Sequence, residues 1–180
     1  PLLSNIERMG IKNSIVMNCD TEYFARSYIG VFDLVIADAP CSGEGMFRKS
    51  VDALEMWSQQ NVQMCAERQR TILENGAKCV KNGGFLLYST CTFSPEENEL
   101  TVDAFLASHP DFKLVKVPDA VEKISRDGVR FNGVTCQNIE YARRFYPHVF
   151  PCEGQFAALM QKIDDNDTEY IEKRNISDER

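Results

Sequence analysis

Two short apolar segments, each ending in a polar cluster with one cysteine, place the strongest constraint on how this chain can fold. The first is FDLVIADAPCSGEGMFRK, from Phe32 to Lys49, and the second is FLLYSTCTFSPEEN, from Phe85 to Asn98. Both begin as runs of strand-forming residues. In an open, mostly parallel α/β sheet, ligands bind beyond the carboxyl ends of the strands. Cys41 and Cys91 are therefore expected where chemistry takes place.

The length and composition of the chain favour a single domain. With 180 residues, of which 43% are hydrophobic, it can bury one sizeable core but not two. No apolar run approaches the roughly 18 residues of a membrane span, and the start of the chain lacks the pattern of a signal peptide. The seven cysteines include no Cys-x-x-Cys pair, which favours reduced thiols over a zinc cluster. We therefore expect a cytoplasmic protein that binds neither a membrane nor a metal.

The net charge of −7 disfavours a nucleic-acid partner at first sight, because phosphate binding depends on a surplus of Lys and Arg. Residues 164–180 hold seven acids and three bases, a net charge of −4, which leaves −3 for residues 1–163. We expect residues 1–163 to form the domain and 164–180 an acidic linker or tail. Two pairs of basic residues can meet phosphates but are more often plain surface, namely Arg48 with Lys49 and Arg143 with Arg144.

Apolar residues at helical spacing predict the helices. The expected helices are residues 2–9, a long amphipathic helix from about Ser58 to the Asn82-Gly83-Gly84 stop, and a helix from Ser94 to before His109, while residues 23–28 form a connector or a short helix. In the third helix, Ser94 can act as the cap and Glu97 can complete a capping box.

Short runs of apolar and β-branched residues predict the strands. They are expected at residues 14–18, 32–37, 85–89, 112–117 and 155–161, with a loop or hairpin over residues 118–141. The near-continuous apolar character of residues 32–37 fits a strand that is buried on both faces. This order of strands and helices predicts an α/β fold.

The polar residues at the two strand ends can carry chemistry. Asp38 and Cys41 are at most about 10 Å apart, because they are three residues apart along the chain. The thiolate is the reactive form of cysteine and is favoured near a helix N-terminus. Cys91 precedes the cap expected at Ser94, so it is the better nucleophile. The other cysteines are expected to be small apolar filler, namely Cys19, Cys65, Cys79, Cys136 and Cys152.

The motifs around the two cysteines resemble those of a known enzyme family. The stretches DAPCSGEGMFRK, WSQQN, YSTCTFSPEENE and RRFYPHVFPCEGQFAALMQK are similar to those of the RNA 5-methylcytosine methyltransferases, in particular the bacterial F-type enzymes that methylate 16S ribosomal RNA. The resemblance covers about residues 1 to 162. It implies a Rossmann-like fold, S-adenosylmethionine as the cofactor and RNA as the partner, with small-subunit ribosomal RNA as the expected substrate.

The resemblance also implies roles for the polar residues at the strand ends. Cys91 is expected to attack carbon 6 of cytosine, which turns the ring into an enamine that can accept a methyl group at carbon 5. Cys41 is expected to assist release of the adduct. Asp38 is expected beside the edge of the cytosine and the methionyl end of the cofactor.

The expected binding residues come from the resemblance, for the cofactor, and from local positive charge, for the RNA. Asp20 matches the acidic residue that meets the adenine amino group of the cofactor, although it reads equally well as a turn or helix-capping aspartate. Arg48 and Lys49 are expected to contact the RNA substrate.

The chain departs from the family pattern at its start: no Pro-Gly-Gly-Lys motif occurs in its 180 residues, and its one Gly-x-Gly, Gly43-Glu44-Gly45, belongs to the motif around Cys41. It looks like the C-terminal part of the catalytic domain, without the N-terminal strands, two of which would lie between the strands at residues 14–18 and 32–37. This fragment alone is expected to be inactive and to bind the cofactor weakly.

Two other functions remain open at this point. The first is a thiol redox protein that uses Cys41 and Cys91 as a disulfide couple, although no Cys-x-x-Cys motif supports it. The second is a non-catalytic RNA-binding module with a methyltransferase fold. Alkylation followed by mass spectrometry tests the first, and cofactor titration tests the second.

Overall fold

The computed structural model describes residues 2–164, so the tail expected over residues 164–180 lies outside the described part except for Asp164. The helices are α1 (Leu2–Arg8), α2 (Thr21–Ser27), α3 (Val51–Met56), α4 (Gln59–Cys79), α5 (Glu99–Ser108) and α6 (Asp119–Glu122), with 3₁₀ turns η1 (Glu44–Met46) and η2 (Ile139–Tyr141). The strands are β1 (Phe32–Asp38), β2 (Val80–Thr90), β3 (Phe112–Leu114), β4 (Arg126–Asp127), β5 (Arg143–Phe145) and β6 (Gln155–Lys162).

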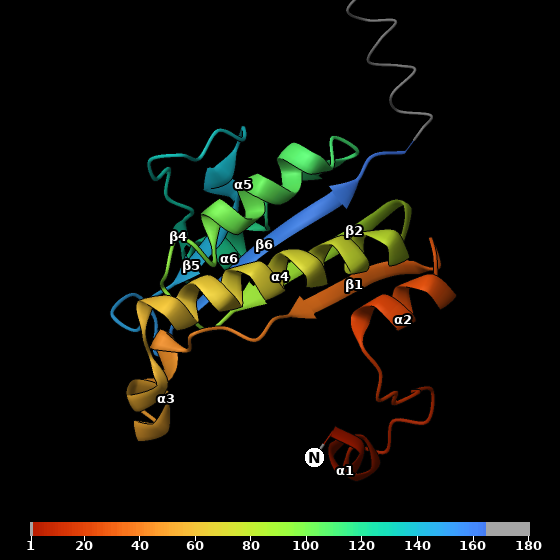
Figure 1. Ribbon diagram of the computed structural model, residues 1–180, viewed down its shortest axis with the longest axis horizontal. Coiled ribbons are helices and arrows are strands. Elements are labelled where there is room, and N and C mark those ends of the chain that lie inside the picture. The colour runs from red at the N-terminus through yellow and green to blue at the C-terminus, as the bar shows by residue number, and fades with distance from the viewer. Residues whose placement is uncertain (1, 165–180) are drawn as a thin grey trace, which may run out of the picture.

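The strands form one sheet in the order β1-β2-β6-β5-β4, with β3 also paired to β6 (Figure 1). The pair β1 and β2 is parallel, and the other pairs in the described chain are antiparallel. The α/β class is therefore confirmed, but the expectation of a mostly parallel sheet is wrong for the part of the chain described. The parallel pair is connected through α4, as a crossover between parallel strands requires.

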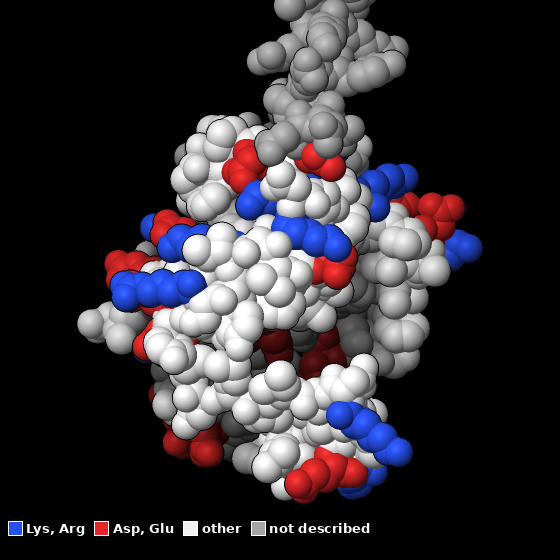
Figure 2. Space-filling view, turned by 90° about the vertical axis from the view of Figure 1, so that its right-hand side faces the viewer, with Lys and Arg blue, Asp and Glu red and all other residues white. Residues whose placement is uncertain are grey.

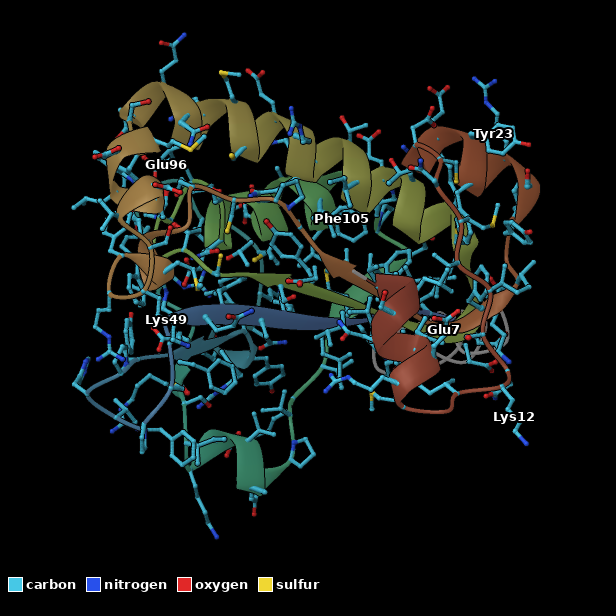
Figure 3. All side chains as sticks on the ribbon, turned by 90° about the horizontal axis from the view of Figure 1, so that it is seen from below. Glu7, Lys12, Tyr23, Lys49, Glu96 and Phe105 are labelled. Carbon is cyan, nitrogen blue, oxygen red and sulfur yellow. The ribbon has the colours of Figure 1, made fainter. Side chains whose placement is uncertain are left out.

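The core lies between α4, α5 and one face of the sheet, and Figure 3 shows α4 lying over the strands. Helix α4 begins where expected, because the Ser58 hydroxyl oxygen accepts a hydrogen bond from the backbone N–H of Asn61 at 3.1 Å. Leu73 of α4 and Leu86 of β2 are completely buried in this core. The helix approaches the sheet closely at Gly76, where an added Cβ would lie 3.3 Å from a Leu86 methyl group. This packing aligns the carboxyl ends of β1 and β2.

Two expectations near the N-terminus are wrong. Residues 14–18 form no strand, and Ile15 is 87% exposed, because no described segment pairs with them. Strand β1 is not buried on both faces either, since Leu34 and Ile36 are 48% and 61% exposed on the face that α4 does not cover. A β-branched run becomes a buried strand only where a partner strand and a covering layer are present.

Several boundaries also differ from the expected ones. Helix α4 ends at Cys79, before the glycines, and β2 begins at Val80 and includes Gly83 in a left-handed conformation. A register shift between Phe32 and Leu34 of β1 accommodates these extra residues of β2. Strand β3 stops at Leu114 rather than at residue 117. Residues 118–141 contain α6, β4 and η2 instead of a simple loop.

No helix in the described part of the chain is both long and apolar enough to cross a membrane. Figure 2 shows the side of the molecule on which α1 and α2 lie, and basic and acidic side chains are interspersed there. That face therefore presents no continuous basic patch.

Candidate active site

The two cysteines meet beyond the carboxyl ends of the parallel strands. Asp38 and Ser89 are paired in the register of β1 and β2, and the Ser89 hydroxyl donates a hydrogen bond to the Asp38 carboxylate at 2.9 Å. Beyond them, the Sγ atoms of Cys41 and Cys91 lie 3.0 Å apart. We call these two residues the thiol pair. The expected proximity of Asp38, Cys41 and Cys91 is thus present in the structure.

The two sulfurs form a hydrogen bond in which either thiol can be the donor, and the backbone N–H of Cys91 also donates to Cys41 Sγ at 3.2 Å. A hydrogen bond from the Cys41 thiol lowers the pKa of Cys91 to about 7, against the opposing effect of burial. The same contact, together with burial, raises the pKa of Cys41 well above the ordinary range of a thiol. When the proton of this contact lies on Cys41, the negative charge rests on Cys91, and the directions of the two pKa shifts favour this arrangement. This makes Cys91 the more reactive thiol near neutral pH.

The physical cause of this activation differs from the one expected from sequence. Helix α5 begins at Glu99 rather than at Ser94, and no side chain caps it. The Ser94 hydroxyl instead donates to Glu96 at 2.7 Å, and the Glu97 carboxylate accepts the backbone N–H of Ser42 at 3.0 Å. The predicted capping box is wrong because a tertiary contact takes Glu97. Cys91 owes its lowered pKa to Cys41 and not to a helix terminus.

Two loops carry the thiol pair: the Cys41 loop (residues 39–47) and the Cys91 loop (residues 91–98). The Ser42 and Thr92 hydroxyl groups lie 2.9 Å apart, and the Gly45 N–H donates to the carbonyl oxygen of Cys91 at 2.9 Å. A Cβ on Gly45 would collide with the backbone of Gly154, so the close approach of these segments requires glycine at this position. The loops are therefore held together by bonds from both sides.

The basic pair on β5 is neither surface nor open to phosphates. Arg143 and Arg144 are 4% and 3% exposed. Arg143 forms an ion pair with Asp127, and Arg144 forms a bidentate ion pair with the buried Glu99. Arg144 also donates to the carbonyl oxygen of Phe93 at 3.0 Å, which ties the Cys91 loop to β5. Both interpretations that the sequence left open for this pair are thus wrong.

The other basic pair, Arg48 and Lys49, is exposed, so the structure is compatible with the predicted contact to RNA. The side chains of Arg48 and Lys49 are 65% and 61% exposed, and both contact Glu153, at 3.5 and 3.2 Å. Figure 3 places Lys49 at the same end of the molecule as Glu96 of the Cys91 loop, and Tyr23 at the opposite end. Glu153 neutralises part of their charge, so phosphates would compete with it for this pair.

Asp20 is the N-cap of α2. Its carboxylate accepts the backbone N–H of Tyr23 at 2.7 Å, as in the capping interpretation. The neighbouring Thr21 accepts a hydrogen bond from Asn75 of α4 at 3.1 Å. Gln69 lies six residues earlier on α4 and contacts the carbonyl oxygen of Pro40, beside Cys41, at 2.9 Å. Six helical residues span about 9 Å, so the contact at Thr21, beside Asp20, and the contact at Pro40, beside Cys41, are about this far apart along α4.

The remaining cysteines differ in burial, and all seven are free. Cys79 is buried as expected of apolar filler, whereas Cys65, Cys136 and Cys152 are half-buried. Cys19 is exposed, so the filler interpretation is wrong for it. Among residues 2–164, no group of three or more His, Cys, Asp or Glu side chains is arranged to hold a metal ion.

Sequence reasoning missed the acidic residues that connect the two loops. Glu44 accepts hydrogen bonds from the Cys91 loop, and Glu97 accepts one from the Cys41 loop. The available signal was an acidic residue shortly after each cysteine, in motifs that are otherwise small and polar. Buried glutamates cannot be told from exposed ones by residue type alone, because most glutamates are exposed.

Solved structures with similar folds define the class of this protein. A methyltransferase homologue from Pyrococcus horikoshii is 29% identical, with a TM-score of 0.70 over 89% of this chain and 48% of its own. The structure of NSun6 from the same organism with SFG, an analogue of S-adenosylmethionine, is 27% identical, with a TM-score of 0.66 over 91% of this chain and 38% of its own. The chain thus forms part of the fold of the S-adenosylmethionine-dependent methyltransferases.

The family follows from the sequence comparison. The family described as 16S rRNA methyltransferase RsmB/F matches residues 1–161, and the chain belongs to it. Ribosomal RNA small subunit methyltransferase F of Vibrio parahaemolyticus is 36% identical over 96% of this chain and 34% of its own length. The 25S rRNA (cytosine-C(5))-methyltransferase nop2 of Schizosaccharomyces pombe is 34% identical over 99% of this chain and 29% of its own length. The chain therefore spans about a third of the length of these relatives, and the resemblance stated from its motifs is confirmed.

Proposed function

We propose that this chain forms part of the catalytic domain of an RNA (cytosine-5-)-methyltransferase that acts on small-subunit ribosomal RNA. The observation that carries the proposal is the contact of Cys41 and Cys91 at 3.0 Å, with Asp38 at the end of the adjoining strand. Relatives that are 34–36% identical to nearly the whole of this chain are named as ribosomal RNA methyltransferases. The RNA partner and the cofactor of this chain are inferred from these relatives.

Cys91 is the nucleophile in this proposal. Its thiolate adds to carbon 6 of cytosine, and the electron pair displaced from the ring makes carbon 5 nucleophilic. S-adenosylmethionine, when bound, supplies the methyl group that carbon 5 accepts. A water molecule then takes the proton from carbon 5, the electron pair of the carbon–hydrogen bond re-forms the double bond between carbons 5 and 6, and the carbon–sulfur bond breaks to release the Cys91 thiolate.

Cys41 assists the release step. When Cys91 carries a negative charge, the thiol of Cys41 is the donor of the hydrogen bond between the two sulfurs, and a bond to a charged acceptor is stronger than one to a neutral acceptor. A thiolate with a lower pKa is a better leaving group. Cys41 thereby stabilises the state in which Cys91 has left the cytosine. This role follows from the same contact that activates Cys91 for attack.

Asp38 and Asp20 fit the polar ends of the cofactor and the substrate. Asp38 is exposed at the end of β1, so its carboxylate can accept hydrogen bonds from the cytosine amino group or the methionyl ammonium group. Asp20 is also exposed, and its separation from the thiol pair suits the adenine end of an elongated cofactor. We expect Arg48 and Lys49 to contact the phosphates of the RNA.

The reaction is tested with a protein that contains this chain together with the glycine-rich loop of the family. The protein is incubated with S-adenosylmethionine and small-subunit ribosomal RNA, and the nucleosides are separated and identified by mass spectrometry. We expect 5-methylcytosine to accumulate. A methyl group on another atom, or no methylation although both ligands bind, would contradict the proposal.

One alternative function is favoured by a specific observation. The sulfurs of the thiol pair are 3.0 Å apart, and a disulfide of about 2.05 Å would need only a small movement. A redox couple should oxidise reversibly to this one bridge, which alkylation and mass spectrometry detect. If the oxidised pair forms at the potential of a thiol buffer and no methylation occurs, the redox function replaces the proposed one.

We also propose that the protein works in the cytoplasm. All seven cysteines in the described residues are free, which fits a reducing compartment.

A further inference from the structure

A carboxylate of the Cys91 loop, that of Glu97, binds the backbone of the Cys41 loop. Oε2 of Glu97 accepts the backbone N–H of Ser42, the residue after Cys41, at 3.0 Å. The same oxygen accepts the side-chain amide of Gln69 from α4 at 2.8 Å. Glu97 is completely buried, so these bonds do not compete with water. They fix the backbone next to Cys41 relative to the Cys91 loop.

A carboxylate of the Cys41 loop, that of Glu44, binds the backbone of the Cys91 loop in the same way. Oε2 of Glu44 accepts the backbone N–H of Phe93 at 3.0 Å and the hydroxyl group of Thr92 at 3.2 Å. Its other oxygen, Oε1, accepts the indole N–H of Trp57 at 2.9 Å. These bonds fix the residues that follow Cys91 relative to the Cys41 loop.

We propose that Glu44 and Glu97 act as a reciprocal carboxylate clamp that holds Cys41 Sγ and Cys91 Sγ in contact. Each member belongs to one loop and binds a backbone N–H of the other. The two cysteines are fifty residues apart in sequence and follow different strands, so the strands alone do not fix the distance between the sulfurs. Glu44 and Glu97 are therefore positioning residues. Their value for methyl transfer rests on the proposed function, whereas their effect on the thiol pair does not.

The charges of Glu44 and Glu97 do not favour a thiolate nearby, which indicates that these residues serve to position the two sulfurs. The hydrogen bond with Cys41 lowers the pKa of Cys91, the negative charge of Glu97 opposes this lowering, and burial raises the pKa of Glu97 itself. A buried carboxylate beside a reactive thiolate is thus unfavourable on electrostatic grounds for both groups. The hydrogen bonds to the neighbouring loop offset this cost. Removing the charge and removing the bonds should consequently change the reactivity of Cys91 in opposite directions.

The test compares Glu97→Gln with Glu97→Ala. In Glu97→Gln, the amide oxygen can take the place of Oε2 and keep both the Ser42 and the Gln69 bonds, while the charge is lost. In Glu97→Ala, charge and bonds are both lost. The rate of Cys91 alkylation by iodoacetamide is measured from pH 5 to pH 10 and assigned by peptide mass spectrometry on the 180-residue chain.

We expect Glu97→Ala to react on the order of tenfold more slowly than wild type at pH 7, because loss of the sulfur contact removes thiolate from Cys91. Glu97→Gln should react as fast as wild type or faster. Glu44→Ala should also slow the reaction, and because Glu44 is only half-buried it decides the question if Glu97→Ala does not fold. Glu96→Ala is the matched control, since Glu96 binds Ser94 and Gln59 and neither loop depends on it for the clamp.

The clamp is refuted if folded Glu44→Ala, or folded Glu97→Ala, keeps the wild-type pH profile, or if Glu96→Ala slows Cys91 as much as they do. Thermal melting of each variant establishes that it is folded. The assay needs neither RNA nor cofactor. Absence of methylation therefore leaves the clamp standing, and a refuted clamp leaves the methylation experiment to decide the function.

Discussion

The loops around the thiol pair and the N-terminal segment (residues 2–20) differ in which side chains they bury. In the loops, buried polar groups such as Glu97 are matched by partners from other parts of the described chain. In the N-terminal segment, α1 has no buried residue, and Met9 and Ile15 are 69% and 87% exposed. Apolar side chains are thus uncovered at one place while carboxylates are buried at another. The buried side chains of this molecule are concentrated around β2 and β6 and the face of β1 that α4 covers.

This difference predicts the largest effects at the thiol pair. In a protein that includes the cofactor loop, Cys91→Ala should abolish both methylation and any covalent RNA adduct, because attack at carbon 6 cannot begin. Cys41→Ala should still form the adduct, more slowly at pH 7 because the activating hydrogen bond is lost, and should fail to release it. The adduct is detected on denaturing gels. The opposite pattern would exchange the roles of the two cysteines, and no effect of either substitution would remove both from the mechanism.

The next effect concerns the buried ion pair behind the Cys91 loop. Arg144→Ala leaves Glu99 buried and unpaired, and should lower the free energy of unfolding by about 3–5 kcal/mol. The matched control is Arg130→Ala, whose ion pair with Glu140 is half exposed and should contribute at most about 1 kcal/mol. Urea unfolding of both variants provides the measurement. Equal losses for the two would mean that burial does not distinguish these pairs.

The next prediction concerns the cofactor site, of which this chain supplies only a part. The 180-residue chain offers Asp20 and Asp38 but no glycine-rich loop, so we expect it to bind S-adenosylmethionine weakly or not at all. Isothermal titration calorimetry is the direct measurement. Micromolar affinity would show that the described residues suffice for the cofactor.

The smallest effect is expected in the N-terminal segment. Ile15→Ser should change the free energy of unfolding by less than about 0.5 kcal/mol, because the side chain is already exposed. Leu86→Ala, which truncates a fully buried side chain of β2, should cost about 2–5 kcal/mol. If Ile15→Ser were as damaging as Leu86→Ala, the contrast between the two regions would be wrong.

Patterns within single segments predicted the elements that depend on local signals. Helix α4 begins after Ser58 as expected, because the cap and the apolar stripe both lie in the sequence itself. Strands β1 and β6 follow from their apolar runs. The meeting of Cys41 and Cys91 follows from the rule for strand ends, although their distance does not.

Tertiary contacts decided the cases in which sequence reasoning failed. Glu97 has the spacing of a capping residue, but its carboxylate instead accepts a hydrogen bond from the backbone N–H of Ser42, fifty-five residues away in sequence. Arg144 has no sequence signal that separates a buried arginine from an exposed one, and β5 was missed because its two arginines are charged. Residues 14–18 have strand propensity but no partner in the described chain.

The pH dependence of thiol alkylation in the wild-type chain tests most directly whether Cys91 is the more reactive thiol of the pair. Iodoacetamide labelling is followed at Cys41 and Cys91 by peptide mass spectrometry, with N-acetylcysteine as the reference thiol. Because the pKa of Cys91 is lowered to about 7, its labelling should rise through half of its maximum near pH 7, below the value of about 8.5 for a free thiol. Cys41 should be labelled only at higher pH. Labelling of Cys41 before Cys91, or of Cys91 with the profile of the reference thiol, would contradict the account.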